Sequence, residues 1–113
     1  MARLTIRIDF DDGSGLGPGK VQLLELVART GSIRKAAAEL GMSYRKAWLL
    51  LQALKETFGT PLVDTASGGK SGGGTSLTAA GREVVSRYRK LEQAAGKAAE
   101  ADLKALTRRV RVE

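Results

Sequence analysis

The glycine-rich segment Ser67–Thr78 (SGGKSGGGTSLT) contains residue types that could bind a phosphate. Gly69-Lys70-Ser71 matches the last three positions of a Walker nucleotide-binding loop, in which an earlier glycine is required and a helix follows. Asp64 occupies the position of that earlier glycine, and its carboxylate would repel a phosphate. Gly72-Gly73-Gly74 comes next and is a poor start for a helix. The segment is therefore not predicted to bind a nucleotide.

The chain offers few groups for catalysis or metal binding. Its 113 residues include no cysteine and no histidine, which excludes thiolate metal sites and removes the commonest general base. Asp9, Asp11 and Asp12 are close in sequence, but the following Gly13-Ser14-Gly15 is typical of a turn, which we favour over a metal site. We expect no enzymatic activity, no metal, no cofactor and no identifiable small-molecule ligand.

The charge balance points to a polyanionic partner. Nineteen Lys and Arg residues against twelve Asp and Glu residues give a net charge of +7. Such an excess suits DNA, RNA or an anionic membrane surface, although charge can also serve solubility alone. The apolar runs are far shorter than the roughly 20 residues that span a bilayer, and no signal-peptide pattern follows Met1. We therefore expect a cytoplasmic, nucleoid-associated protein with no membrane partner.

Helical spacing of apolar residues predicts three consecutive helices in the first half of the chain. The first covers Lys20–Thr30, and the second has one apolar face formed by Ile33, Ala36, Ala37 and Leu40. The third covers Tyr44–Phe58, with an inward stripe at Ala47, Leu50, Leu51, Leu54 and Phe58. Ser32 and Ser43 are suitable N-caps, and Gly31, Gly41 and Gly59 follow the helices. The small alanines and the short Gly41-Met42 turn predict a helix-turn-helix.

The N-terminal end of the third helix carries the candidate nucleic-acid contacts, since this end of a recognition helix meets base edges in the major groove. The outward positions are Ser43, Tyr44, Arg45, Lys46, Trp48 and Leu49. Arg45 can bond guanine bidentately or hold a phosphate, whereas Lys46 is more typical of a phosphate contact. Trp48 could stack on a sugar or contact a thymine methyl, or it could pack against the second helix or the base of the hairpin that follows.

A β-hairpin after this helix accounts for the glycine-rich segment. Thr60–Val63 is expected to be extended, and Thr75–Leu77 to return as a second strand. A hairpin placed directly after a recognition helix describes the wing of a winged helix. The residues expected to approach the sugar-phosphate backbone are Ser67, Gly68, Gly69, Lys70, Ser71 and Thr75. The alternative is a surface loop without contacts. At the other end of the domain, alternation over Arg3–Phe10 predicts a half-buried strand.

A long final helix is predicted from its Thr78 cap to about Leu106. Spacings of 4, 3, 4 and 3 residues separate the members of an apolar seam at Val84, Tyr88, Leu91, Ala95 and Ala98. This 3.5-residue period favours pairing with a second copy of the chain, and the alternative is that the helix folds back on its own domain. Arg87, Arg89 and Lys90 could reach flanking phosphates, but a solvated face is favoured.

The whole chain is thus predicted to be mainly α with small β structure. Residues 1–77 would form a winged helix-turn-helix with an N-terminal strand, residues 78–106 a dimerisation helix packed on it, and residues 107–113 a frayed tail. A two-fold dimer would place two recognition helices about one DNA turn apart, roughly 34 Å.

Several motifs resemble the N-terminal DNA-binding domain of ModE-type molybdenum-responsive regulators, and two of them also resemble LysR-type domains. The resemblance covers Ile8 to about Ala98. Its motifs are Gly31-Ser32-Ile33-x-x-Ala36-Ala37, Gly41-x-Ser43-Tyr44-x-x-Ala47-Trp48, Phe58-Gly59-x-Pro61-Leu62, Gly68-Gly69-Lys70-x-Gly72-Gly73-Gly74 and Leu77-Thr78-x-x-Gly81.

This resemblance implies a dimeric winged helix-turn-helix that binds double-stranded DNA at an inverted-repeat operator. It assigns recognition roles to Ser43, Tyr44, Arg45 and Lys46, and wing roles to Lys70 and its neighbours. The family's C-terminal molybdate-binding domains have no counterpart before Glu113, so a molybdate sensor is not expected. The function predicted is a sequence-specific transcriptional regulator. The alternative is a non-specific architectural DNA- or RNA-binding protein.

Overall fold

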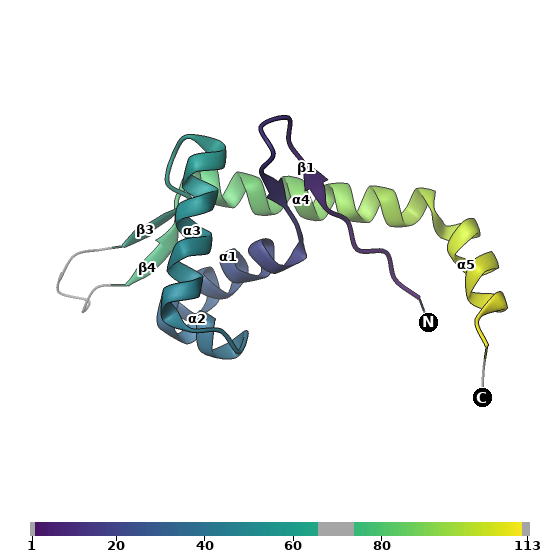
Figure 1. The fold of residues 1–113 in the computed structure, drawn as a ribbon, viewed down its shortest axis with the longest axis horizontal. Helices are drawn as coiled ribbons and strands as arrows, with labels where there is room; N and C mark the ends of the chain where they lie inside the picture. The colour runs from purple at the N-terminus through teal and green to yellow at the C-terminus, as the bar shows by residue number, and fades with distance from the viewer. Residues whose placement is uncertain (1, 66–73, 112–113) are drawn as a thin grey trace.

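The computed structural model describes residues 2–65 and 74–111, which form helices and two small antiparallel sheets (Figure 1). The elements are β1 (Ile8–Asp9), β2 (Gly15–Leu16), α1 (Pro18–Thr30), α2 (Ile33–Glu39), α3 (Tyr44–Phe58), β3 (Val63–Thr65), β4 (Thr75–Leu77), α4 (Ala79–Ala98) and α5 (Glu100–Arg109). β1 pairs with β2, and β3 with β4. This arrangement confirms the predicted mainly α fold with a small amount of β structure.

Both helices of the helix-turn-helix begin at their predicted N-caps, and α3 ends at Gly59 as predicted, whereas Leu40 and not Gly41 caps the end of α2. The Ser32 hydroxyl accepts a hydrogen bond from the Lys35 amide, and the Ser43 hydroxyl accepts one from the Lys46 amide, each at 3.0 Å. Between the two helices, Gly41 has a φ of 68°, a left-handed conformation that glycine adopts without strain. Each serine cap contributes about 1 kcal/mol, so these local signals define where α2 and α3 start.

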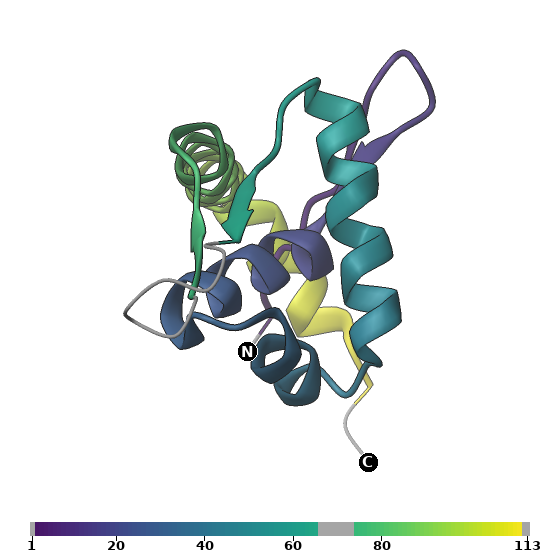
Figure 2. The same cartoon turned by 90° about the vertical axis from the view of Figure 1, so that its left-hand side faces the viewer.

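α1 is the central element of the core. Its Val21, Leu23, Leu24 and Val27 are fully buried. It packs against α2, α3, α4 and β4, and Figure 2 shows α3 and the β3–β4 hairpin on different sides of it. Burying one such aliphatic side chain stabilises the fold by about 1.5–3 kcal/mol. α1 therefore fixes the positions of the recognition helix and the hairpin relative to each other.

The N-terminal strand is shorter than predicted. The alternation over Arg3–Phe10 does appear in the burial, with every second side chain half-buried, but only Ile8 and Asp9 pair with another strand. The Phe10 amide donates to the Ser14 carbonyl and the Gly13 amide to the Phe10 carbonyl, which closes a turn. The chain then returns for just Gly15 and Leu16, a strand that was not predicted from the sequence. Because α1 begins at Pro18, no further partner residues are available.

The first hairpin strand is displaced from its predicted position. Instead of Thr60–Val63, the strand is β3, with Val63 opposite Leu77 and Thr65 opposite Thr75. Pro61 has no amide hydrogen with which to extend the ladder. Its carbonyl accepts a 2.8 Å hydrogen bond from the hydroxyl of Thr78, the N-cap residue of α4. The chain before β3 therefore contacts the start of α4 and does not extend the hairpin.

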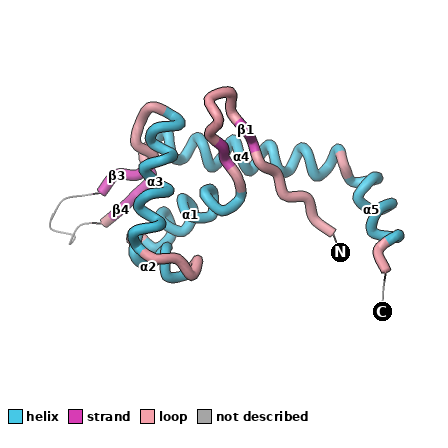
Figure 3. Tube along the Cα trace, viewed as in Figure 1, coloured by secondary structure: helices cyan, strands magenta, loops and turns pink. Residues whose placement is uncertain are grey.

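The predicted single C-terminal helix is divided in two. α4 ends at Ala98, Ala99 has φ −91° and ψ 2°, and α5 leaves at an angle (Figure 3). The last buried side chain of α4 is Tyr88, and Gly96 lowers the helix propensity beyond it, so little packing keeps this region straight. α5 is helical through Arg109, which includes residues that the sequence assigns to a tail.

Candidate nucleic-acid interface

The first turns of α3 present a group of exposed side chains. The backbone anchor is Ala47, which is fully buried. Around it, the structure exposes all six residues predicted at this end: Ser43, Tyr44, Arg45, Lys46, Trp48 and Leu49. Because the side chain of Ala47 is small, the backbone of α3 can pack closely against the core. The outward side chains of α3 remain accessible to solvent. Contact of these residues with DNA stays a prediction.

Trp48 is not enclosed by its own chain. Its exposed fraction is 44%, close to the 42% of Tyr44 and the 48% of Leu49. This exposed fraction leaves part of Trp48 accessible, and both interpretations, contact with DNA and packing against α2 or the hairpin base, stay predictions. Exposed large apolar side chains that gather on one element often mark an interaction surface. This one lies beside two cations, Arg45 and Lys46.

The electrostatics at this end favour an anion. Arg34 and Lys35 lie in the first turn of α2, and Arg45 and Lys46 in the first turn of α3. Neither turn contains an acidic residue. The free amides at a helix N-terminus carry a partial positive charge that adds to these side chains. The four cations and the N-terminal end of α3 thus form a surface suited to phosphate groups.

The base of the wing is fixed to the helix-turn-helix. The Thr75 amide donates a 2.9 Å hydrogen bond to the Gly31 carbonyl, at the junction of α1 and α2. Thr75 itself is half-buried. The other predicted wing residues, Ser67, Gly68, Gly69, Lys70 and Ser71, lie outside the described residues. The described part of the hairpin is therefore attached at the same junction that leads into α2.

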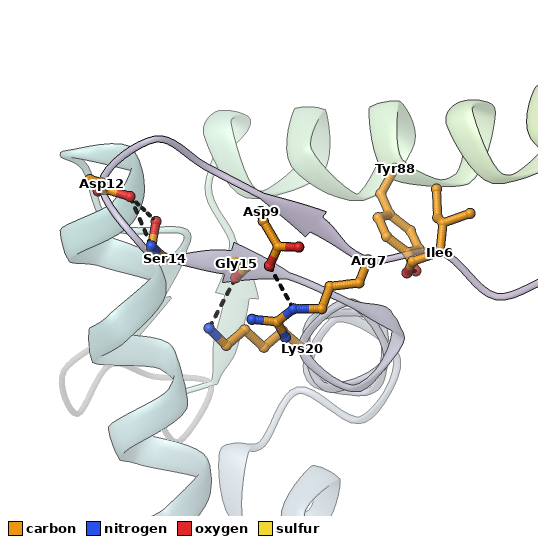
Figure 4. Close-up of polar contacts among 8 residues, drawn as sticks. All are labelled: Ile6, Arg7, Asp9, Asp12, Ser14, Gly15, Lys20 and Tyr88. Carbon is orange, nitrogen blue, oxygen red and sulfur yellow. Dashed lines mark hydrogen bonds and ion pairs between the residues drawn. The ribbon is translucent and has the colours of Figure 1, made fainter.

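The predicted dimer seam is partly used within the monomer. Tyr88 is 1% exposed, and its hydroxyl donates a 2.6 Å hydrogen bond to the Ile6 carbonyl (Figure 4). Burial raises the pKa of the Tyr88 phenol. Assigning Tyr88 to an intermolecular interface is therefore wrong. Val84 is half-buried against the core and Ala95 is half-buried, whereas Leu91 and Ala98 are exposed.

An apolar groove lies beside this seam, and sequence reasoning did not predict it. It has a volume of about 490 Å³ and runs between the β1–β2 hairpin, the C-terminal end of α3 and α4. Its lining includes Ile8, Phe10, Leu16, Phe58, Val84 and Leu91. The alternation of Ile8 and Phe10 was the available signal, but it did not show which surface these side chains would line. The groove therefore offers an apolar surface that includes the exposed Leu91.

Arg89 does not lie on a solvated face. Its guanidinium donates hydrogen bonds of 2.9 and 2.6 Å to the two carboxylate oxygens of Glu25 in α1, and one of 2.7 Å to Glu92. The bonds to Glu25, followed by the bond to Glu92, raise the pKa of Arg89. A bidentate pair of this kind is geometrically specific. It therefore fixes the direction of α4 relative to α1.

Two of the three neighbouring aspartates, Asp9 and Asp12, form contacts with nearby side chains (Figure 4). Asp12 accepts hydrogen bonds from the Ser14 hydroxyl at 2.6 Å and from the Ser14 amide at 2.9 Å. The hydroxyl contact, followed by the amide contact, lowers the pKa of Asp12. Asp9 pairs with Arg7 at 2.8 Å. Within residues 2–65 and 74–111, no three acidic side chains gather in a geometry that could hold a metal ion.

The part of the chain that the structure describes contains no helix with the length and apolarity needed to cross a bilayer.

Comparison with known proteins gives the same picture. Residues 19–82 match the family described as bacterial regulatory helix-turn-helix protein, lysR family. Among solved structures, a crystal structure of the CbnR_DBD–DNA complex aligns with a TM-score of 0.61 and 25% identity, covering 78% of this chain and 95% of that chain.

Three curated relatives show the similarity in sequence. The chain is 42% identical over 85 residues to the molybdenum-pterin-binding protein MopB of Rhodobacter capsulatus, 75% of this chain and 32% of that protein. It is 40% identical over 92 residues to the molybdenum transport protein ModE of Azotobacter vinelandii, with coverages of 81% and 33%. It is 37% identical over 81 residues to the DNA-binding transcriptional dual regulator ModE of Escherichia coli K12, with coverages of 72% and 31%. The matched region thus spans about a third of each relative.

Proposed function

Since the chain belongs to the lysR family of bacterial regulatory helix-turn-helix proteins, we propose that it is a sequence-specific DNA-binding transcriptional regulator that acts as a dimer on an inverted-repeat operator. α3 enters the major groove with its N-terminal end, and the wing steadies the complex from the neighbouring backbone. We expect the protein to act on the nucleoid in the cytoplasm.

The observation that carries this proposal is the composition of the first turn of α3. It combines a capped N-terminus, two exposed cations and an exposed aromatic surface, with no acidic residue among them. Arg45 has the donor geometry to bond guanine bidentately, whereas Lys46 suits a phosphate. Phosphate contacts set the register of the protein on the duplex, and contacts to base edges select the sequence.

The dimer is proposed to form through α4 and the apolar groove beside it. Leu91 is half exposed next to a groove that is lined largely by apolar side chains. The Arg89–Glu25 pair holds α4 against α1. If α4 is fixed to its own domain and also packs against the α4 of a second copy, it sets the separation between the two recognition helices. For adjacent half-sites this separation is roughly 34 Å.

The regulated genes are proposed to serve molybdenum uptake or use, because the relatives from Azotobacter vinelandii and Rhodobacter capsulatus are named for molybdenum transport and molybdenum-pterin binding. This part of the proposal concerns targets and assigns no molybdate binding to residues 1–113. Genome-wide mapping of bound sites tests it directly. Enrichment at promoters unrelated to molybdenum would contradict it without affecting the DNA-binding proposal.

Selection from a random duplex library tests the DNA-binding proposal. We expect enrichment of an inverted repeat, whose log K falls with log salt concentration at a slope of about −0.9 for each phosphate neutralised. Random DNA of the same length should bind with an affinity at least about a thousandfold lower at fixed salt. Equal affinity for both would favour the non-specific architectural protein, for which the net charge of +7 would suffice.

A further inference from the structure

A contact between α2 and α3 involves two residues that face the predicted DNA surface. The central carbon of the Arg34 guanidinium lies 4.6 Å from the centroid of the Tyr44 ring. This distance is within the roughly 6 Å range of cation–π attraction. Arg34 is the second residue of α2, and Tyr44 is the first residue of α3. The contact therefore bridges the turn of the helix-turn-helix.

The contact limits the freedom of an exposed ring. An exposed aromatic side chain at the start of a helix can otherwise exchange between rotamers. Arginine and lysine are both attracted to an aromatic face, but only the planar guanidinium of arginine can stack flat on it and so restrict the ring more strongly. Arg34 contacts the Tyr44 ring from an element whose position is fixed by the core through Ile33, Ala36 and Ala37.

Tyr44 and Trp48 lie on the same exposed face of α3. The two residues are four positions apart, which places them one above the other along a helix. Both are more than 40% exposed. Together they give the positively charged end of α3 an apolar surface. In the major groove, the apolar feature that a base pair presents is the 5-methyl group of thymine.

We propose that Arg34 is a positioning residue that holds the Tyr44 ring beside Trp48 as a surface for thymine methyl groups in the operator. The inference rests on the proposed function, since it needs α3 to read DNA. It assigns to Arg34 a role in specificity, whereas a cation in the first turn of a helix would otherwise be taken as a phosphate contact.

The test uses the operator obtained by selection, with each thymine replaced in turn by deoxyuridine, which removes only the methyl group. We expect the wild-type protein to lose about fourfold in affinity at one or more positions, the effect of burying a single methyl group. The same replacement of thymine by deoxyuridine should leave the affinity almost unchanged in three variants, Arg34→Ala, Arg34→Lys and Tyr44→Ala. Arg34→Lys keeps the charge, so its salt slope should equal that of the wild type.

Lys35→Ala is the matched control, because it removes one charge from the neighbouring exposed position of α2. It should weaken binding to thymine and deoxyuridine duplexes equally and keep the fourfold difference between them. A wild-type protein that selects an operator but does not distinguish deoxyuridine from thymine would overturn the inference alone. The same conclusion follows if Arg34→Lys retains the full discrimination. A wild-type protein that selects no operator would overturn the proposed function, and the inference with it.

Discussion

The hydroxyl group of Tyr88 in α4 lies 2.6 Å from the carbonyl oxygen of Ile6, a hydrogen bond across 82 positions of the sequence. It joins the N-terminal segment to the helix that also carries Leu91. One face of α4 is thus occupied within the monomer, and the half-exposed Leu91 remains accessible beside the apolar groove. The helix that we propose to join two subunits is therefore also a part of the domain core.

Removing the Tyr88 hydroxyl should destabilise the fold in a pH-dependent way. Tyr88→Phe leaves the Ile6 carbonyl without its donor, and we expect the free energy of unfolding to fall by about 1 kcal/mol at pH 8. Burial raises the folded-state pKa of Tyr88 above its usual value. The contribution from its protonated form is therefore complete below about pH 10 and is lost as pH rises through the folded-state pKa.

Chemical denaturation of both proteins from about pH 8 to pH 11 measures this effect. The comparison cancels the titration of the lysines, which the two proteins share. The difference in stability between wild type and Tyr88→Phe should shrink above pH 10. A constant difference over the whole range would contradict the assigned burial.

Two glycines of α4 should respond in opposite directions to the same substitution. A Cβ atom at Gly81 would overlap the Leu62 carbonyl oxygen, so Gly81→Ala should lower the free energy of unfolding by about 1–3 kcal/mol. A Cβ at Gly96 meets nothing within 4 Å, so Gly96→Ala should raise it by about 0.5–1 kcal/mol. Thermal unfolding distinguishes the pair, and destabilisation of equal size in both variants would contradict the packing of α4 on the chain before β3.

Two substitutions of Ser43 distinguish its effect on the stability of α3 from its proposed effect on DNA binding. Ser43→Ala removes the acceptor for the Lys46 amide and should cost about 1 kcal/mol. Ser43→Asp keeps a capping acceptor and should retain wild-type stability, but its negative charge would lie next to a phosphate. Binding to the selected operator should therefore fall much more for Ser43→Asp than for Ser43→Ala. The reverse order would place this end of α3 away from DNA.

Leu91→Lys should disrupt the proposed dimer with little effect on the fold, because this side chain is 50% exposed. Gln93→Lys is the control, since it adds the same charge to the same helix at an exposed position outside the apolar groove. Analytical ultracentrifugation at micromolar concentration should show monomers for Leu91→Lys and dimers for Gln93→Lys. Dimers of both variants would exclude this groove as the interface.

The helix-turn-helix could be predicted because its signals are local. Ser32, Ser43 and Gly41 each act within a few residues of their position, and the buried stripe of α3 shows the helical period. The hairpin strand β3 begins three residues later than predicted, because the cap of α4 uses the carbonyl of Pro61, a tertiary contact that the local pattern does not contain.

Contacts between distant residues could not be predicted in the same way. The partner of Arg89 is 64 positions away in α1, and a charged residue on a helix looks the same in sequence whether it faces solvent or a carboxylate. The apolar period of α4 indicated that Tyr88 is buried. It did not show that the segment around Ile6 of the same chain is its packing partner. The Arg34–Tyr44 contact was likewise hidden, although both residues lie in the motif that the sequence did identify.

The central claim is that the N-terminal end of α3 reads base edges, and Arg45→Ala tests it most directly. Affinities of wild type and variant should be measured for the selected operator and for random DNA of equal length at one salt concentration. We predict that Arg45→Ala weakens operator binding by about 1–3 kcal/mol, relaxes the preference at one base pair and affects random DNA much less. An equal loss on both duplexes, or no loss on either, would contradict the claim.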